Sequence, residues 1–188
     1  MSNKGSNVPP RQKVTGKFPV LHVGSVPKFD RETWDFIVEG LVEKEMRLTY
    51  AEFLELPKTV TKSDFHCVEG WTRLGNVWEG VQFRTIVDLA KPLSLAKYAT
   101  VIAEGNYTTS LPLQDLLDED VVLAYRLDGE SLPPDHGGPL RLVVPKKYAY
   151  KSAKWVRKVR FTEKQEIGYW EKRGFSNTAD PWKEERYS

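Results

Sequence analysis

The chain has 188 residues, and its 28 lysine and arginine residues nearly balance 26 aspartate and glutamate residues, for a net charge of +2. Total charge therefore points to neither a nucleic-acid partner nor a membrane surface. The single cysteine, Cys67, excludes an intrachain disulfide, so a buried core must hold the fold, and a reducing compartment suits such a chain. We therefore expect a cytoplasmic protein.

The sequence predicts neither a membrane-spanning helix nor an N-terminal export signal. No apolar run approaches the roughly 18 residues that a membrane-spanning helix needs, and residues 1–20 lack both the apolar core of a signal peptide and a twin-arginine pair. The sequence predicts a disordered arm over residues 1–17, because its first ten residues are polar and rich in glycine and proline. Residues 18–188 are predicted to form one domain, including a C-terminal segment that wraps its surface.

The first half of that domain predicts short strands around one small helix. Residues 18–27, cut by two prolines and a glycine, predict an extended segment, and residues 34–40 and 59–68 predict strands. The later strand delivers Cys67 near its end, where functional sites are often built. Between the two strands, Thr49 with a glutamate three residues later is a capping box that predicts a short helix.

The second half continues in the same pattern. Residues 78–81 are predicted as a turn and residues 81–89 as a second short helix. Further strands are predicted over residues 98–103, 107–112, 121–127 and 155–161 and within 136–145, with one helical turn over 113–117. Residues 168–182 are rich in aromatic residues without a period. These elements predict a single α+β domain with a mixed sheet and short helices.

The surroundings of Cys67 leave several interpretations open. A lone cysteine in a soluble protein is most often a small buried apolar residue. Neighbouring His66 points to the opposite face of a strand, which weakens a cysteine–histidine hydrolase, and three histidines without paired spacing weaken a zinc site. A thiolate can still be the only protein ligand of a metal whose other ligands come from a cofactor.

A basic run is the second unusual feature. Seven basic residues and no acidic one lie within fifteen positions: Lys146, Lys147, Lys151, Lys154, Arg157, Lys158 and Arg160. Such a run can be a solvated strand face, a nucleic-acid patch, or part of an anion pocket in which Arg141 forks onto a phosphate. The flexible stretch His136-Gly137-Gly138 would let the backbone approach such an anion closely. The anion pocket and the thiolate together suggest an anionic cofactor that carries a metal.

Three separated motifs then resemble, in order and spacing, the molybdopterin domain of sulfite oxidase-like oxidoreductases. They are Cys67-Val-Glu-Gly-Trp71, His136-Gly-Gly-Pro-Leu-Arg141-Leu-Val-Val-Pro145 and Tyr148-Ala-Tyr-Lys-Ser152-Ala-Lys154-Trp155-Val156. The resemblance covers residues 18 to 161 and looks closest to short bacterial members and to the catalytic subunit of the methionine sulfoxide reductase branch. It implies the sulfite oxidase molybdopterin-binding fold and a molybdenum–molybdopterin cofactor.

The resemblance also implies roles for individual residues. It implies that the thiolate of Cys67 is the protein ligand of molybdenum and that oxygen-atom transfer to or from a small-molecule substrate takes place there, with an electron-transfer partner. The cofactor-binding residues that it implies are His22, His136 and Arg141 for the pterin and its phosphate, and Ser152, Ala153 and Lys154 for a phosphate clamp.

The chain departs from the family pattern after the cysteine. In animal and plant sulfite oxidases a basic stretch that helps to bind sulfite follows it, whereas here Glu69-Gly70-Trp71-Thr72 follows and Arg73 is the only nearby cation. We therefore expect reduction of an S-oxide or N-oxide, with Cys67, Trp71, Tyr107 and Arg73 as the candidate catalytic residues. Sulfite oxidation at the same site and a non-enzymatic module that binds nucleic acid stay open as alternatives, although we expect no nucleic-acid partner and no transmembrane segment.

Overall fold

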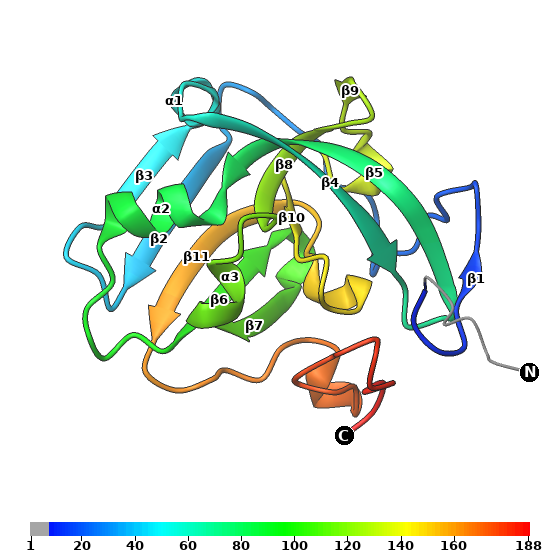
Figure 1. The fold of residues 1–188 in the computed structure, drawn as a ribbon. Helices are drawn as coiled ribbons and strands as arrows, with labels where there is room; N and C mark the ends of the chain where they lie inside the picture. Colours follow the sequence, from blue (N-terminus) through cyan, green and yellow to red (C-terminus); the bar gives the residue numbers. More distant parts are fainter. Residues whose placement is uncertain (1–7) are drawn as a thin grey trace, which may run out of the picture.

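Two facing β-sheets make up the fold of this computed structural model, which describes residues 8–188 (Figure 1). The larger sheet contains β1 (Lys13–Val14), β4 (Lys58–His66), β5 (Trp71–Gln82), β8 (Val122–Leu127), β9 (Glu130–Ser131) and β10 (Arg141–Val143). The smaller contains β2 (Asp35–Gly40), β3 (Met46–Thr49), β6 (Tyr98–Ala103), β7 (Thr108–Pro112) and β11 (Val156–Thr162).

The strand order makes both sheets mixed. The larger sheet runs β1-β5-β8-β10, with β4 beside β5 and β9 beside β8, and the smaller runs β3-β2-β11-β6-β7. Strand β1 is parallel to β5 and β11 is parallel to β2, whereas the other pairs are antiparallel. The predicted α+β class with mixed strands is therefore confirmed.

The helices are short, as the sequence predicts. They are α1 (Tyr50–Leu54), α2 (Phe83–Ala90) and α3 (Leu113–Leu116), with 3₁₀ turns η1 (Glu104–Asn106), η2 (Pro134–His136), η3 (Ala149–Lys151) and η4 (Glu171–Arg173). The capping box of α1 is confirmed, because the Thr49 hydroxyl accepts a bond from the Glu52 amide while the Glu52 carboxylate accepts one from the Thr49 amide. No helix in residues 8–188 is long and apolar enough to span a membrane.

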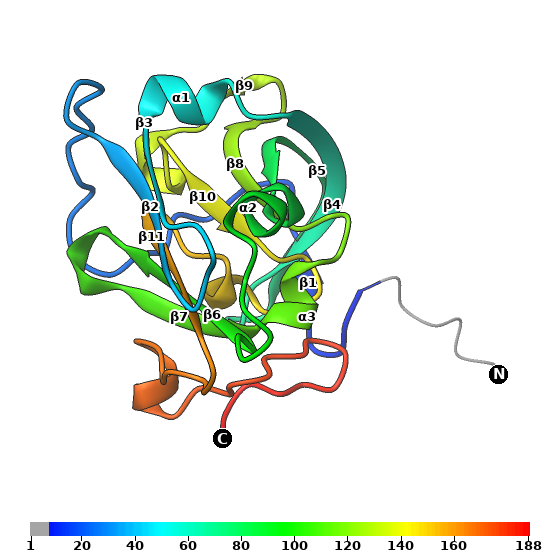
Figure 2. The ribbon, with the colours of Figure 1, turned by 90° about the vertical axis from the view of Figure 1, so that its left-hand side faces the viewer.

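The main core lies between the two sheets. Phe36 from β2, Val101 from β6 and Leu123 from β8 are fully buried there, together with Phe83 and Ile86 of α2. Figure 2 shows α2 between the two sheets. A second apolar cluster, around Phe65, Trp78 and Val122, covers the other face of the larger sheet, since neighbouring strand residues point to opposite faces. The candidate site is built against this second face.

Two sequence predictions do not match the structure. The turn predicted over residues 78–81 is wrong, because these residues lie inside β5, where a bulge sets Gly80 against β8. The disordered arm predicted over residues 1–17 is wrong at Lys13–Val14, which pair in parallel with β5 as strand β1. Residues 1–7 of that predicted arm lie outside the described residues.

The chain after β11 packs along one side of the molecule. In Figure 1 this segment, orange to red, runs below α3, β6 and β7 and contains η4. It is hydrogen-bonded to the body of the fold, because Tyr169 N donates to Thr108 O at 2.8 Å and Tyr148 N donates to Ala179 O at 2.8 Å. The segment carries aromatic side chains to the candidate site.

Candidate active site

A cavity of about 340 Å³ gathers all but one of the predicted site residues. Its walls come from the segment after β1, the β4–β5 turn, the loops around β10 and η3, and the C-terminal segment. The predicted residues on these walls are His22, Cys67, Trp71, Tyr107, His136, Arg141, Ser152, Ala153 and Lys154. Residues far apart in the sequence therefore meet in one place, as their predicted roles require.

Cys67 occupies the tight turn that joins β4 to β5. Its amide donates to Trp71 O at 2.8 Å, and its carbonyl accepts from Gly70 N at 3.0 Å. Gly70 has φ +94°, which favours glycine. The thiol is 6% exposed, and burial raises its pKa to about 11. The free thiol is therefore protonated at neutral pH, and a bound cation would favour its thiolate.

Arg141 is a buried cation that has no carboxylate partner among residues 8–188. Its side chain donates to His136 O at 2.8 Å, and its guanidinium lies 4.7 Å from the centroid of the Phe65 ring. Burial lowers its pKa to about 10, although it stays charged at neutral pH. Its Nε is buried without a hydrogen-bond partner. A buried cation of this kind is expected to pair with an anion.

Two more nitrogen donors lie on the same wall. The His136 ring stacks 4.5 Å from Phe18, and its Nδ1 is buried without a partner. Lys154 Nζ donates to Asp135 O at 2.6 Å, and burial, with the charge of Arg141, lowers the pKa of Lys154 to about 7. An anionic ligand would pair with these groups, so the wall fits the phosphate-bearing pterin that the resemblance implies.

Hydrogen bonds and close packing of the backbone hold the segments of this wall next to one another. The Ser152 hydroxyl accepts from Val144 N at 3.0 Å, and Ala153 O accepts from Leu142 N at 2.9 Å, which holds the predicted phosphate clamp against β10. Gly137 has φ +113°, and a Cβ there would lie 3.1 Å from a Lys154 carbon and 3.2 Å from one of Arg141. A side chain at Gly137 would crowd both cations.

The remaining predicted residues have different positions. The His22 ring lies on the cavity wall, 5.2 Å from the Trp155 ring, and its Nδ1 is 3.0 Å from Gly24 O. Trp71 lines the cavity beside Cys67, and the Tyr107 hydroxyl donates to Tyr150 O.

Arg73 is the predicted residue that does not line the cavity. Its guanidinium donates to Asn76 and to Asp128, the latter at 2.5 Å, and lies 5.3 Å from the centroid of the Phe18 ring. Among the described residues that line the cavity, Glu69 carries the one carboxylate. Arg73 therefore adds no side chain to the cavity wall, and the cations that act on the Cys67 thiol are Arg141 and Arg186.

Sequence reasoning missed most of the aromatic wall. The missed lining residues are Phe18, Phe65, Tyr150, Trp155, Trp170 and Phe175. The unusual aromatic content of residues 168–182 was the available signal for the last two. It could not be assigned to the site, because nothing in a segment without a period says which surface it covers.

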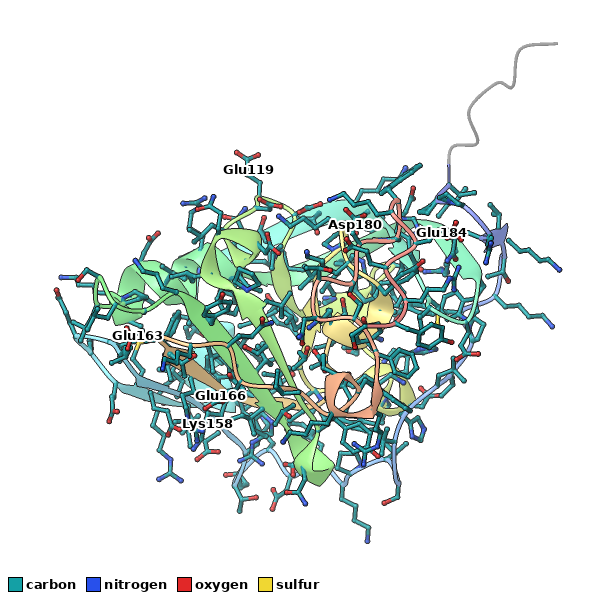
Figure 3. The ribbon with its side chains drawn as sticks, turned by 90° about the horizontal axis from the view of Figure 1, so that it is seen from below. Glu119, Lys158, Glu163, Glu166, Asp180 and Glu184 are labelled. Carbon is teal, nitrogen blue, oxygen red and sulfur yellow. The ribbon has the colours of Figure 1, made fainter. Side chains whose placement is uncertain are left out.

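The basic run does not form one patch. Lys146 and Lys147 pair with Asp115, Lys151 with Glu171, Arg157 with Asp35, and Lys158 and Arg160 with Glu39. Of the run, Lys154 alone lines the cavity described above. Figure 3 labels Lys158 in the same part of the view as Glu163 and Glu166. Of the seven basic residues, only Lys154 is therefore placed where it could serve the anion pocket.

Comparison with known proteins identifies relatives along the whole chain. Residues 23–170 match the family model described as oxidoreductase molybdopterin binding domain. An uncharacterized oxidoreductase of Bacillus subtilis (strain 168), YuiH, is 44% identical over 188 residues, which cover 100% of this chain and 95% of that protein. The putative protein-methionine-sulfoxide reductase subunit YedZ1 of Azospira oryzae is 30% identical over 177 residues, 93% of this chain and 67% of the relative.

A solved structure shows the same fold. The crystal structure of the sulfane dehydrogenase SoxCD from Paracoccus pantotrophus superposes with a TM-score of 0.71 at 24% identity, covering 77% of this chain and 42% of that one. This likeness confirms the predicted sulfite oxidase-like molybdopterin-binding fold. The family match spans most of the chain, and the donor wall fits an anionic pterin. The chain belongs to the oxidoreductase molybdopterin-binding domain family and is a molybdenum-cofactor-dependent oxidoreductase.

Proposed function

We propose that this protein reduces an organic S-oxide or N-oxide by oxygen-atom transfer at a molybdenum bound by Cys67. The observation that carries the proposal is the position of the lone thiol in the same cavity as Arg141, His136 and Lys154, where Arg141 Nε and His136 Nδ1 are buried without a hydrogen-bond partner. The thiol would bind the metal, and Arg141, His136 and Lys154 would hold the anionic part of the cofactor. Oxygen-atom transfer, with the electrons that it requires, is the chemistry that the molybdenum cofactor supplies when bound.

The position of Arg73 outside the cavity and the Glu69 carboxylate on its wall support a neutral substrate over sulfite. Arg73 is engaged with Asp128, and the Glu69 carboxylate on the cavity wall would repel a small dianion. Trp71 offers an apolar aromatic surface for the organic part of an S-oxide. Tyr107 would add a second such surface, because its hydroxyl proton is already donated to Tyr150 O.

The test compares the wild type with Cys67→Ser, both produced in a host with an intact cofactor pathway. We expect molybdenum in the wild-type protein and reduction of methionine sulfoxide, dimethyl sulfoxide or trimethylamine N-oxide with a reduced viologen dye. Cys67→Ser should keep its fold and lose activity by on the order of 100-fold or more, because metal ligation needs the soft thiolate. Elemental analysis, the visible spectrum and circular dichroism provide the readouts.

Thr59→Ser, a conservative change at the far end of β4, is the matched control and should behave as the wild type. A wild-type protein without molybdenum, combined with activity that survives Cys67→Ser, would contradict the proposal. Sulfite oxidation that exceeds S-oxide and N-oxide reduction would contradict the substrate class alone.

The location and the electron partner belong to the same proposal. We expect a cytoplasmic protein, since its single thiol suits a reducing compartment, and a separate redox protein as the source of electrons. Cell fractionation tests the location. Cross-linking in cell extract, followed by identification of redox proteins captured by the wild type, tests the partner.

A further inference from the structure

The turn that carries Cys67 is held by the N-terminal strand. Strand β1 pairs with β5 at Trp71 and Thr72, directly after the turn, and Lys13 N donates to Gly70 O at 2.9 Å. Figure 1 shows β1 beside the end of the β4–β5 hairpin. The residue before this strand, Gln12, is half-buried and points its amide into the turn.

The Gln12 side chain joins two points of the turn. Its Nε2 donates to Cys67 O at 3.1 Å, and its Oε1 accepts from the Thr72 hydroxyl at 3.1 Å. The orientation of the amide follows from chemistry, because a carbonyl can only accept and therefore must face the NH₂ group. The Cys67 carbonyl thus accepts two bonds, one from Gly70 N within the turn and one from Gln12 outside it.

The direction in which the Thr72 hydroxyl donates also determines which nitrogen of His66 carries a hydrogen. The Thr72 hydroxyl has one proton, which it gives to Gln12 Oε1, so it must accept at its contact with His66 Nδ1, 2.8 Å away. His66 Nδ1 therefore carries a hydrogen. One chain of hydrogen bonds runs from the histidine before the cysteine, through Thr72 and Gln12, to the carbonyl of the cysteine itself.

We propose that Gln12 is a positioning residue for the Cys67 ligand: its amide fixes the peptide plane after Cys67 and, through Thr72, the Nδ1–H tautomer of His66. The held carbonyl carbon is bonded directly to Cys67 Cα, so the two hydrogen bonds restrain the backbone that carries the sulfur. Groups that orient a metal ligand tune the metal as well as its affinity. The role in metal binding rests on the proposed ligation by Cys67, whereas the tautomer does not.

Two variants of Gln12 test the two hydrogen bonds that its side-chain amide makes. Gln12→Leu removes both hydrogen bonds at similar size, and Gln12→Glu keeps an acceptor for Thr72 but faces Cys67 O with a carboxylate oxygen. We expect both holo-proteins to retain molybdenum, to shift the paramagnetic resonance spectrum of half-reduced molybdenum, and to shift the midpoint potential. Lys13→Ala changes an exposed side chain next to Gln12, at the start of β1, so it is the matched control and should leave spectrum and potential unchanged. If Gln12→Leu fails to fold, Gln12→Glu carries the comparison.

A second readout needs no cofactor. Nitrogen-15 NMR of the three histidines should show a hydrogen on His66 Nδ1 in the wild type. Thr72→Val, which removes the hydroxyl at nearly constant volume, should lose this preference, and Thr72→Ser should restore it.

Several results would overturn the inference. They are a wild-type His66 protonated at Nε2 only, or Gln12 variants that lower the melting temperature while the spectrum and potential match the wild type. A failed metal assignment has a different signature, because Cys67→Ser would then keep the wild-type molybdenum spectrum. The two failures are therefore distinguishable.

Discussion

Arg141 illustrates at the scale of one residue how a binding site lowers the stability of its own fold. The guanidinium is 3% exposed and has no carboxylate partner among residues 8–188, and its Nε is unpaired. Burying such a charge is unfavourable until an anion arrives. The residue is therefore better suited to a bound cofactor than to the cofactor-free chain.

Replacement of Arg141 should separate these two effects. We expect Arg141→Gln to lower cofactor retention by roughly 10- to 100-fold, because a charge-assisted hydrogen bond contributes about 1.5–3 kcal/mol. The free energy of unfolding of the cofactor-free protein should stay unchanged or rise by about 1 kcal/mol, since a buried unpaired charge is removed. Pterin content after oxidative release and urea denaturation measure the two quantities.

Arg126→Gln is the matched control, because Arg126 is exposed and donates to Gly129 O outside the cavity. It should retain the cofactor. A loss of more than about 2 kcal/mol in cofactor-free Arg141→Gln would contradict the view that Arg141 serves the ligand at the expense of the fold.

The sequence motifs predicted which residues lie in the site, but they did not predict which side chains those residues contact. Cys67, His136, Arg141 and Lys154 fall in one cavity, as the motifs imply. Arg73 does not, because its guanidinium is taken up by Asp128, a partner 55 positions away whose proximity depends on the pairing of β5 with β8. Long-range pairing of this kind cannot be read from local spacing.

At the scale of one element, Gly80 prevented the prediction of β5 as one continuous strand. Gly80 resembles a turn residue in the sequence, but it lies in the strand where the chain passes close to β8: an added Cβ would lie 2.1 Å from Leu123 O and 2.7 Å from Ala124 Cα. Glycine in a strand can mark a bulge or a close approach, and only the neighbouring strand shows that this is the case here. The strands without glycine, such as β6 and β11, were predictable.

We expect Gly80→Ala to destabilise the protein by about 1–3 kcal/mol, because the methyl group can be accommodated only if the β5–β8 backbones move apart. The measurement is urea denaturation of the cofactor-free protein. Gly16→Ala is the matched control, since a Cβ there meets nothing within 4 Å, and it should change stability by less than about 0.5 kcal/mol. Equal stability of the two variants would show that this close approach is absent.

The C-terminal segment is held to the body of the fold by a buried ion pair. Lys151 of η3 and Glu171 of η4 form this pair with side chains 0% and 2% exposed. Lys151 Nζ also donates to Ser110 O at 3.1 Å, and the Thr109 hydroxyl donates to the Glu171 carboxylate at 3.0 Å. The neighbouring Trp170 lines the cavity, so this pair fixes part of the wall of the candidate site.

Removing one partner of this ion pair should lower the free energy of unfolding far more than replacing both partners with apolar residues. We expect Glu171→Gln to lower the free energy of unfolding by about 3–5 kcal/mol, because it leaves the Lys151 charge buried, and Lys151→Met with Glu171→Leu to recover most of the loss. Glu166→Gln, which removes the exposed contact with Arg160, should cost less than about 1 kcal/mol. A double variant as unstable as the single one would contradict this account.

At the scale of the whole molecule, the basic run joins separate parts of the chain. Arg157 of β11 forms an ion pair with Asp35 of β2, and Lys158 and Arg160 both pair with Glu39. Lys147 Nζ lies 2.9 Å from a carboxylate oxygen of Asp115 in α3. The run looked like a patch because most of its acidic partners lie far away in the sequence, such as Asp35, which is 122 positions from Arg157. The charges are therefore mostly neutralised within the fold, which gives the nucleic-acid alternative no support.

These pairs predict how stability depends on pH. Burial alone would raise the pKa of the three carboxyl groups, but the paired cations outweigh it: Arg157 and Arg47 hold the pKa of Asp35 below 3.8, Lys158 and Arg160 that of Glu39 below 4.5, and Lys147 and Lys146 that of Asp115 below 3.8. The folded state therefore binds fewer protons than the unfolded state in this range. The stabilisation is present above these unfolded values and is lost as the pH falls through the lower folded ones.

We expect the urea midpoint of the cofactor-free protein to fall steeply below about pH 4.5. Asp35→Asn should lower the midpoint at neutral pH, because Arg157 and Arg47 each lose a charged partner, and should make the fall in acid shallower, because one of the linked carboxyl groups is gone. Asp30→Asn, in the loop before β2, is an exposed control that should reproduce the wild-type slope. A wild-type midpoint that stays constant down to pH 3 would mean that the ion pairs of the basic run do not contribute to stability in solution.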